Sequence, residues 1–235
     1  EKTVTAINAE DGVFTVEART VILAMGCRER SRGALNIPGS RPAGIYTAGS
    51  AQKLINIYGK NVGKKVVILG SGDIGMIMAR RMSLEGSKVE AVVELMPYLA
   101  GLTRNRVQCL DDFGIPLKLA HTITRIEGDT RVTGVWVAPV DEKKQPIKEK
   151  EQFVERDTVL FSVGLMPENE PFAEHAKLNP WGYFDSGEDC RTATEGLFVA
   201  GDCRSKRIRQ VVTASADGAI AAMAACRYLD CHETV

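Results

Sequence analysis

One short stretch, VVILGSGDIGMIMARRMSLEG at residues 66–86, constrains the fold more than any other part of the chain. Four apolar residues run into three glycines spaced as G-x-G-x-x-G, and a helical pattern follows. In such a unit the first glycine permits a tight turn, the second lets the backbone approach a pyrophosphate, and the third lets helix and strand pack closely. The anion then lies at the helix N-terminus, where unpaired N–H groups favour negative charge. The stretch therefore predicts a dinucleotide site whose contact residues are Gly70, Ser71, Gly72, Asp73, Ile74 and Gly75.

An acidic residue ends the next expected strand and bears on which dinucleotide is bound. KVEAVVE covers residues 88–94, and Glu94 lies 24 positions after Gly70. A carboxylate at this place accepts hydrogen bonds from a ribose 2′-hydroxyl and repels a 2′-phosphate. Residues 95–98 offer no arginine to receive a phosphate. The sequence favours NAD over NADP, and the alternative is that Glu94 is only a solvated strand end.

The segments before this unit read as sheet. Residues 3–17 alternate around Asp11-Gly12 and predict a β-hairpin. ARTVILAMG at residues 18–26 is a continuous apolar run, which predicts a strand buried on both faces. Residues 34–46 are punctuated by prolines and glycines, and we expect a domain boundary there.

The segments after it predict a return to the same sheet. In the helix after the turn, the apolar face is predicted to consist of Ile74, Ile77, Met78 and Met82. A helix over 102–112 and a short strand near 115–119 follow, and then three alternating strands predict an antiparallel insertion over 121–127, 132–140 and 151–157. Buried strands are expected at 158–164 and 196–202, and the helix over 209–229 is apolar nearly all round, so we expect it inside the protein. The fold class is α/β, a Rossmann-like fold with a parallel sheet plus an antiparallel β-meander.

Composition excludes several function classes. Thirty basic and thirty acidic residues cancel, and no basic block marks a nucleic-acid binder. No apolar run approaches the roughly 18 residues that span a bilayer, and no signal pattern begins the chain. We expect a soluble, cytoplasmic protein without nucleic-acid or membrane partners. Six cysteines and three histidines show no metal-ligand spacing, so no metal site is predicted.

Four motifs in order carry a family resemblance. They are TVILAMG at 20–26, the glycine turn at 70–75, SVGLMPEN at 162–169 and LFVAGDCR at 197–204. Over nearly its whole length the chain resembles the flavoproteins with two dinucleotide-binding domains, the pyridine nucleotide-disulfide oxidoreductase superfamily. The resemblance implies an NAD domain inserted in a partial FAD domain: residues 1–45 and 169–235 for FAD, and residues 46–168 for NAD.

The resemblance also implies further cofactor-binding residues. In the family the carboxylate of the Gly-Asp pair, here Gly201 and Asp202, hydrogen-bonds the flavin's ribityl chain. The segment from Arg209 is similar to the thioredoxin reductase branch, in which the start of the last helix meets the pyrimidine edge of the flavin. A helix N-terminus stabilises the negative charge that develops there on reduction. The implied residues are Gly26, Gly164, Gly201, Asp202, Arg209, Gln210 and Val211.

Two departures from the family pattern stand out. The FAD fingerprint expected near the N-terminus is absent, so we expect an N-terminally incomplete chain that binds flavin weakly or not at all by itself. The stretch that matches the C-x-x-C of thioredoxin reductases, residues 46–50, contains no cysteine, which excludes that dithiol chemistry. Cys27 lies in a stretch similar to flavoprotein subunits of heteromeric amine and opine oxidases. Its arginine neighbours, Arg28, Arg30 and Arg32, would favour a lower thiol pKa, although the favoured interpretation of Cys27, as of each cysteine, is a small buried or incidental thiol.

The resemblance implies an FAD-dependent pyridine nucleotide oxidoreductase. Hydride would pass between NAD(H) and flavin, and electrons would leave to an unidentified acceptor or partner subunit. We also expect a homo-oligomer or a subunit of a heteromeric complex, and no catalytic acid, base or nucleophile is identified. Two alternatives stay open: a non-catalytic NAD-binding or scaffold module that lacks FAD, and a single-cofactor NAD-dependent dehydrogenase.

Overall fold

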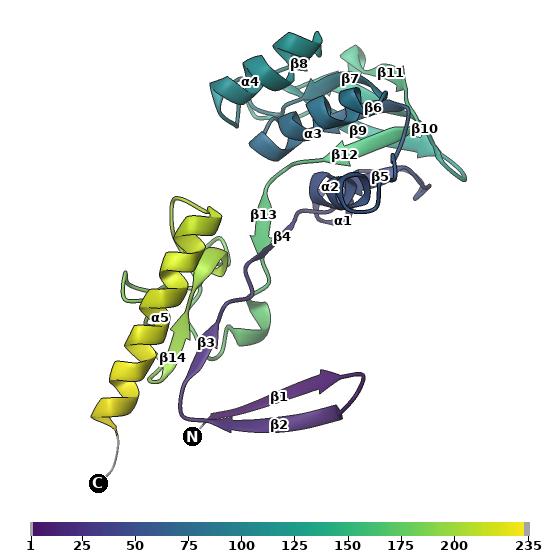
Figure 1. The fold of residues 1–235 in the computed structure, drawn as a ribbon. Coiled ribbons are helices and arrows are strands. Elements are labelled where there is room, and N and C mark those ends of the chain that lie inside the picture. Colours follow the sequence, from purple (N-terminus) through teal and green to yellow (C-terminus); the bar gives the residue numbers. More distant parts are fainter. Residues whose placement is uncertain (1, 233–235) are drawn as a thin grey trace. The chain divides into compact units, whose positions relative to one another are not determined.

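The computed structural model describes residues 2–232 and divides the chain into two compact units (Figure 1). Unit 1 comprises Glu1–Arg28 and Met166–Val235, and unit 2 comprises Glu29–Leu165. The chain passes between them at β4 (Cys27–Glu29) and β13 (Leu165–Pro167). An insertion of one unit into the other is therefore present. The boundaries expected after residues 45 and 168 lie after residues 28 and 165 instead. The segment of residues 30–44 that follows β4, here called the connector, belongs to unit 2, where its Gly39 bridges to Ile126 in the β-meander.

Unit 2 is built on a five-stranded sheet whose strands all run parallel, as the apolar runs predict. Their order across the sheet is β5-β12-β6-β7-β8. The central strands carry apolar side chains to both faces and are buried on both. The strand bounds are β5 Ile45–Thr47, β6 Lys65–Leu69, β7 Lys88–Val93, β8 Leu117–Lys118 and β12 Thr158–Phe161.

Three helices cover one face of this sheet: α2 (Ala48–Asn56), α3 (Asp73–Leu84) and α4 (Thr103–Cys109). The predicted apolar face of α3 is correct for Met78 and Met82, which are fully buried. It is wrong for Ile74 and Ile77, which are 43% and 38% exposed. The buried face of α3 is completed by Gly75, Met76 and Ala79, which fall on the same side as Met82 at 3.6 residues per turn.

An antiparallel meander covers the other face of the sheet and confirms the predicted insertion. Its strands are β9 (His121–Gly128), β10 (Val132–Pro139) and β11 (Gln152–Glu155), in the order β11-β10-β9. A second hydrophobic core lies between this meander and the sheet, and Ile126 and Phe161 are among its buried side chains. The connector adds α1 (Arg32–Leu35), and its Leu35 and Ile37 pack against the same core.

Unit 1 contains the predicted hairpin, β1 (Lys2–Asn8) with β2 (Gly12–Ala18), and a two-stranded parallel sheet of β3 (Val21–Leu23) and β14 (Leu197–Val199). The expectation that the first of these parallel strands is buried on both faces is wrong, since Ile22 is 40% exposed. Helix α5 (Val211–Cys231) covers Phe198 with an alanine-rich face. The expectation that this helix is buried on all sides is wrong, since Met223 is 57% exposed. Within residues 2–232 the sheet beneath α5 has only two strands, so it covers one face of the helix.

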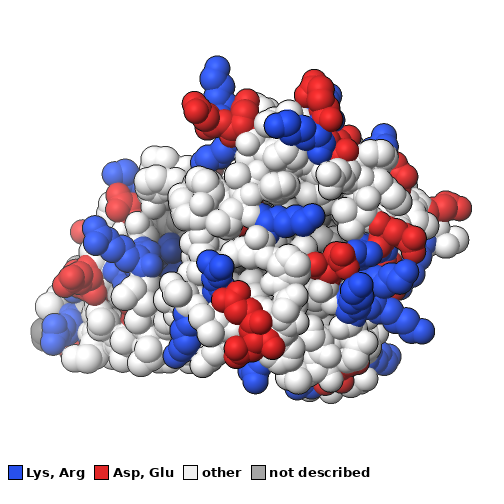
Figure 2. Space-filling view, turned by 90° about the horizontal axis from the view of Figure 1, so that it is seen from above, with Lys and Arg blue, Asp and Glu red and all other residues white. Residues whose placement is uncertain are grey.

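The remaining elements are short 3₁₀ helices at Asp111–Phe113, Lys148–Lys150, Glu170–Phe172 and Gly201–Cys203. Acidic and basic side chains are interspersed over the face drawn in Figure 2, in keeping with the balanced composition. Within residues 2–232 no helix combines the length and the apolar character needed to cross a bilayer.

Candidate functional site

The glycine turn joins β6 to α3 in unit 2, in the strand–turn–helix context that the sequence predicts. Gly70 adopts a φ of +104°, and a Cβ there would lie 2.1 Å from the carbonyl oxygen of Ser162. A Cβ at Gly75 would lie 2.6 Å from the Gly70 oxygen and 2.8 Å from the Ser162 Cβ. Both positions therefore exclude every other residue for reasons internal to the protein.

Gly72 differs from these two glycines. Its φ of −63° suits any residue, and a Cβ there would meet no protein atom closer than 3.7 Å. The protein itself gives no reason for glycine at this position. Gly72 is also the N-cap of α3, whose first N–H groups have no partners within the helix. The bare backbone leaves room for an external anion to approach those groups, so the turn fits a bound pyrophosphate.

Glu94 follows β7 and is buried, with 6% of its surface exposed. Its Oε2 accepts hydrogen bonds from the amide and the hydroxyl of Ser71, at 2.8 and 2.7 Å, and its Oε1 accepts one from the Met96 amide at 2.9 Å. The alternative of a solvated strand end is therefore wrong. The carboxylate fixes the glycine turn from within, and its contact with a ribose hydroxyl stays a prediction.

The segment after Glu94 folds back onto the turn, which the sequence analysis missed. The Ala100 amide donates to the Ser71 hydroxyl at 2.9 Å, and the Gly101 amide donates to the Ser71 carbonyl at 3.0 Å. Oδ1 of Asp73 accepts from the Leu102 amide at 2.8 Å. A Cβ at Gly101 would lie 2.7 Å from that oxygen, so glycine is required there. The glycine in the Ala100-Gly101 pair was the available sequence signal.

The predicted loop residue Gly164 also lies in unit 2, just after β12, whose neighbour β6 leads into the glycine turn. Its φ is +96° and its carbonyl accepts a hydrogen bond from the Arg30 amide at 3.0 Å. The carboxyl ends of parallel strands meet at one edge of a sheet. The turn at 70–75, Glu94 and Gly164 are thus gathered at the carboxyl edge of the five-stranded sheet.

A second group of predicted residues lies in unit 1, at the start of α5. Asp202, Arg209, Gln210 and Val211 line a hollow of about 540 Å³, together with Ala214 and Ser215. Oδ1 of Asp202 is buried and accepts no hydrogen bond from residues 2–232, and Lys206 Nζ lies 3.6 Å from it. An orphaned acceptor beside a helix N-terminus fits a ligand that brings a hydroxyl, as a flavin ribityl chain does. Gly26 and Gly201, the remaining predicted residues of this unit, adopt φ values of +71° and +77°.

A buried ion cluster holds the Gly201-Asp202 turn in place. Asp217 accepts hydrogen bonds from Arg204 Nη1 at 2.8 Å, Lys206 Nζ at 2.9 Å and the Gly201 amide at 3.1 Å. Burial acts to raise the pKa of Asp217, but the hydrogen bonds and charges of Lys206 and Arg204 outweigh it, so the pKa is lowered. Asp217 was not predicted as a site residue from the sequence.

Cys27 behaves differently from the expectation. Its thiol donates to the Asp202 carbonyl at 3.1 Å. Burial raises the pKa of Cys27, and the charge of Arg209 only partly opposes this. The expected lowering by Arg28, Arg30 and Arg32 is therefore wrong. The guanidinium of Arg28 forms an ion pair with Glu168 at 2.5 Å, and Arg30 and Arg32 belong to unit 2.

Comparisons with known proteins agree with this arrangement. A family profile described as pyridine nucleotide-disulphide oxidoreductase matches residues 1–218. The thioredoxin reductase of Treponema pallidum is 30% identical over 234 residues, which cover 97% of this chain and 72% of the relative. That of Bacillus subtilis is 28% identical over 214 residues, which cover 91% of this chain and 64% of the relative. The chain thus spans about two thirds of the length of these relatives.

Solved structures share the fold. The crystal structure of T. acidophilum thioredoxin reductase superposes with a TM-score of 0.77 at 26% identity and covers 97% of this chain, which corresponds to 73% of that chain. A Lactococcus lactis thioredoxin reductase superposes with a TM-score of 0.75 at 21% identity over 94% of this chain and 69% of that chain, and shows the fold alone.

Proposed function

Because the chain belongs to the pyridine nucleotide-disulphide oxidoreductase family, whose cofactors are FAD and a nicotinamide dinucleotide, we propose that it transfers hydride between NAD(H) and FAD. The bound dinucleotides would supply the redox chemistry, and the protein would supply binding and alignment. The observation that carries the proposal is the glycine turn. Gly72 lies at the N-terminus of helix α3, and a side chain at this position would clash with no protein atom. The space beside its backbone is therefore open to a ligand.

In unit 2, residues 70–75 would bind the pyrophosphate through the first amides of α3. Glu94 holds the Ser71 amide and hydroxyl, so the turn is rigid before the ligand arrives. A buried carboxylate next to the ribose would repel a 2′-phosphate. We therefore propose NAD(H) rather than NADP(H) as the preferred partner of this unit.

In unit 1, the orphaned Oδ1 of Asp202 would accept a hydrogen bond from a flavin ribityl hydroxyl. The N-terminus of α5, at Gln210 and Val211, would face the edge of the flavin that becomes negative on reduction. The guanidinium of Arg209 lies over the ring of Tyr183, 3.9 Å from its centre, in a cation–π contact that fixes its position. Its charge would add to that stabilisation.

The electron acceptor differs from that of the thioredoxin reductase relatives in this proposal. Residues 46–50 lack cysteine, and Thr47 instead caps the N-terminus of α2 by accepting from the Ser50 amide. The Glu29 carboxylate accepts from the Gly49 amide at 2.8 and 3.0 Å. The helix start that matches the dithiol position is thus occupied by a carboxylate, and we propose that electrons leave to a different acceptor or to a partner subunit.

Titration of the 235-residue chain with NADH, followed by nucleotide fluorescence, tests the binding step. Gly72→Val should fold, since the space is free of protein atoms, but should lose NADH binding because the side chain fills the approach to the amides. Gly218→Ala in unit 1 is the matched control and should bind NADH normally. Unchanged binding by Gly72→Val would remove the turn from the site.

A further inference from the structure

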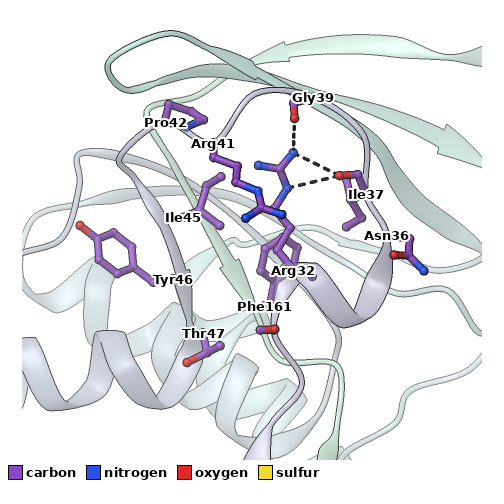
Figure 3. Close-up of a pocket in the computed structure, with 12 residues that line it drawn as sticks. Arg32, Asn36, Ile37, Gly39, Arg41, Pro42, Ile45, Tyr46, Thr47 and Phe161 are labelled. Carbon is purple, nitrogen blue, oxygen red and sulfur yellow. Dashed lines mark hydrogen bonds between the residues drawn. The ribbon is translucent and has the colours of Figure 1, made fainter.

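A hollow of about 620 Å³ lies in unit 2, at the ends of β5 and β12 (Figure 3). One wall is the connector that begins with α1, and the floor is formed by β5 and by Phe161 at the end of β12. All its lining residues fall within Glu29–Leu165, and none belongs to the turn at 70–75. Its volume is within the range of pockets that hold small molecules, about 300–1,000 Å³.

Two arginines face this hollow (Figure 3). The guanidinium of Arg32 is held by the connector backbone: Nη2 donates to the carbonyls of Ile37 at 3.1 Å and Gly39 at 2.8 Å. Arg41 is exposed, and its charge adds to burial in lowering the pKa of Arg32. Across residues 2–232 neither arginine forms an ion pair with a carboxylate, and Arg41 makes no side-chain hydrogen bond.

Two neighbouring positive charges without a counter-ion are unfavourable, and an anion between them relieves the repulsion. Arg32 cannot move away, because the carbonyls hold it. Arg41 is free to present its planar fork, which matches a carboxylate with two parallel hydrogen bonds. The two positive charges therefore favour binding of an anion. Arg41 would bind the anion directly, because the Arg32 guanidinium already donates to backbone carbonyls.

The rest of the lining combines polar side chains, among them Asn36 and Thr47, with an apolar part that can contact the group to which the anion is attached. Ile37, Pro42, Ile45 and Phe161 all face the hollow. Inorganic phosphate or chloride has no apolar surface to bury against these side chains. A hydrocarbon chain or ring would gain about 25 cal/mol of binding free energy per Å² of apolar surface removed from water. The combination of an apolar floor and a free guanidinium suits an organic anion.

We propose that this pocket binds a small organic carboxylate, with the carboxylate on Arg41 and the hydrocarbon part on Ile45 and Phe161. None of the predicted dinucleotide contacts in unit 2 lines this pocket. The proposal does not rest on the proposed function, since it needs neither NAD nor FAD.

The probe is benzoate, whose ring and carboxylate match the two halves of the pocket. Its binding to the 235-residue chain is measured by saturation-transfer NMR titration, with benzamide as the neutral isostere and inorganic phosphate as the competitor. We expect benzoate to bind, benzamide to bind at least about tenfold more weakly, and phosphate to compete poorly. A factor of about ten is the loss expected when one charge-assisted hydrogen bond is removed.

Arg41→Gln should weaken benzoate about tenfold, and Arg41→Lys should weaken it less, because the charge remains while the fork is lost. Arg104→Gln, an exposed arginine on α4, is the matched control and should leave binding unchanged. Circular dichroism spectra check that each variant is folded. The proposal is overturned if wild type does not bind benzoate, if Arg41→Gln binds it equally well, or if benzamide or phosphate binds as tightly as benzoate.

Discussion

Glu94 and Ser71 are joined by two hydrogen bonds, from the serine amide at 2.8 Å and from its hydroxyl at 2.7 Å, both to the carboxylate Oε2. The end of β7 thereby fixes the turn that follows β6, and the carboxylate is buried in doing so. Glu94, which is expected to contact the ribose, thus also holds the conformation of the turn that is expected to bind the pyrophosphate. Changes at Glu94 should affect stability and nucleotide binding together.

Glu94→Gln should lower the free energy of unfolding by about 1–3 kcal/mol, because the amide group of glutamine leaves a buried donor unpaired. NADH should bind more weakly, and the preference over NADPH should shrink. Ser71→Ala, which keeps the backbone bond, should have a smaller effect on both. Urea unfolding and fluorescence titration provide the two readouts. If Glu94→Gln left the free energy of unfolding and the cofactor preference unchanged, the carboxylate would neither stabilise the turn nor select the cofactor.

Gly75→Ala should destabilise the protein and abolish NADH binding, because its Cβ would lie 2.6 Å from the Gly70 oxygen and push α3 off the strand. Thermal unfolding and NADH titration measure the two effects. Gly218→Ala, in α5 with no atom within 4 Å of its Cβ, should instead gain up to about 1 kcal/mol from helix propensity. A Gly75→Ala variant with wild-type melting temperature and NADH affinity would contradict the close packing of turn and helix.

The Cys27 thiol should react slowly with iodoacetamide at pH 7.5. Burial raises its pKa, and only the thiolate is nucleophilic, so the reactive fraction is small until the pH approaches the raised value. The exposed Cys226 is the internal reference. Mass spectrometry of partially alkylated protein should show Cys226 labelled first, with Cys27 catching up as the pH rises. Faster labelling of Cys27 at pH 7.5 would mean that its pKa is lowered after all.

Asp217→Asn should cost about 3–5 kcal/mol at pH 7, because it leaves the buried charge of Arg204 without a carboxylate and leaves Lys206 only the longer pairing with Asp202. The pKa of Asp217 is lowered in the folded protein, so its contribution is present above the ordinary pKa and is lost as the pH falls through the folded value. Wild type should therefore lose this stability below about pH 4, and the variant should lack that part of the dependence.

Urea unfolding between about pH 2 and pH 7 measures the effect of Asp217→Asn. Asp230→Asn, an exposed aspartate on the same helix, is the control and should follow the wild-type curve. Parallel curves for Asp217→Asn and wild type would show that the ion cluster does not set the acid stability of the fold.

Local patterns predicted much of the fold. The hairpin at 3–17, the parallel sheet and the meander follow from alternation and from apolar runs, which depend on neighbouring residues alone. Burial of α5 could not be predicted in the same way, because it depends on how many strands lie beneath the helix. The first unit boundary was misplaced for a similar reason: the connector is held by pairing with strands far along the sequence.

The contacts among the candidate site residues could not be predicted from the sequence. Glu94 and Ser71 were both named, yet their contact arises because β6 and β7 are parallel neighbours whose carboxyl ends meet. Gly101 and Asp217 were missed as site-forming residues, since each acts on a turn distant in sequence. The pKa direction of Cys27 depends on burial, which adjacent arginines in the sequence do not reveal.

The central claim, hydride transfer from NADH to FAD, is tested most directly with the full-length gene product carrying bound flavin. It is mixed anaerobically with NADH and, separately, with NADPH in a stopped-flow instrument, and the loss of flavin absorbance is followed. The account predicts rapid bleaching by NADH and slower bleaching by NADPH. Faster bleaching by NADPH would contradict the role of Glu94, and no bleaching by either nucleotide would contradict the proposed function itself.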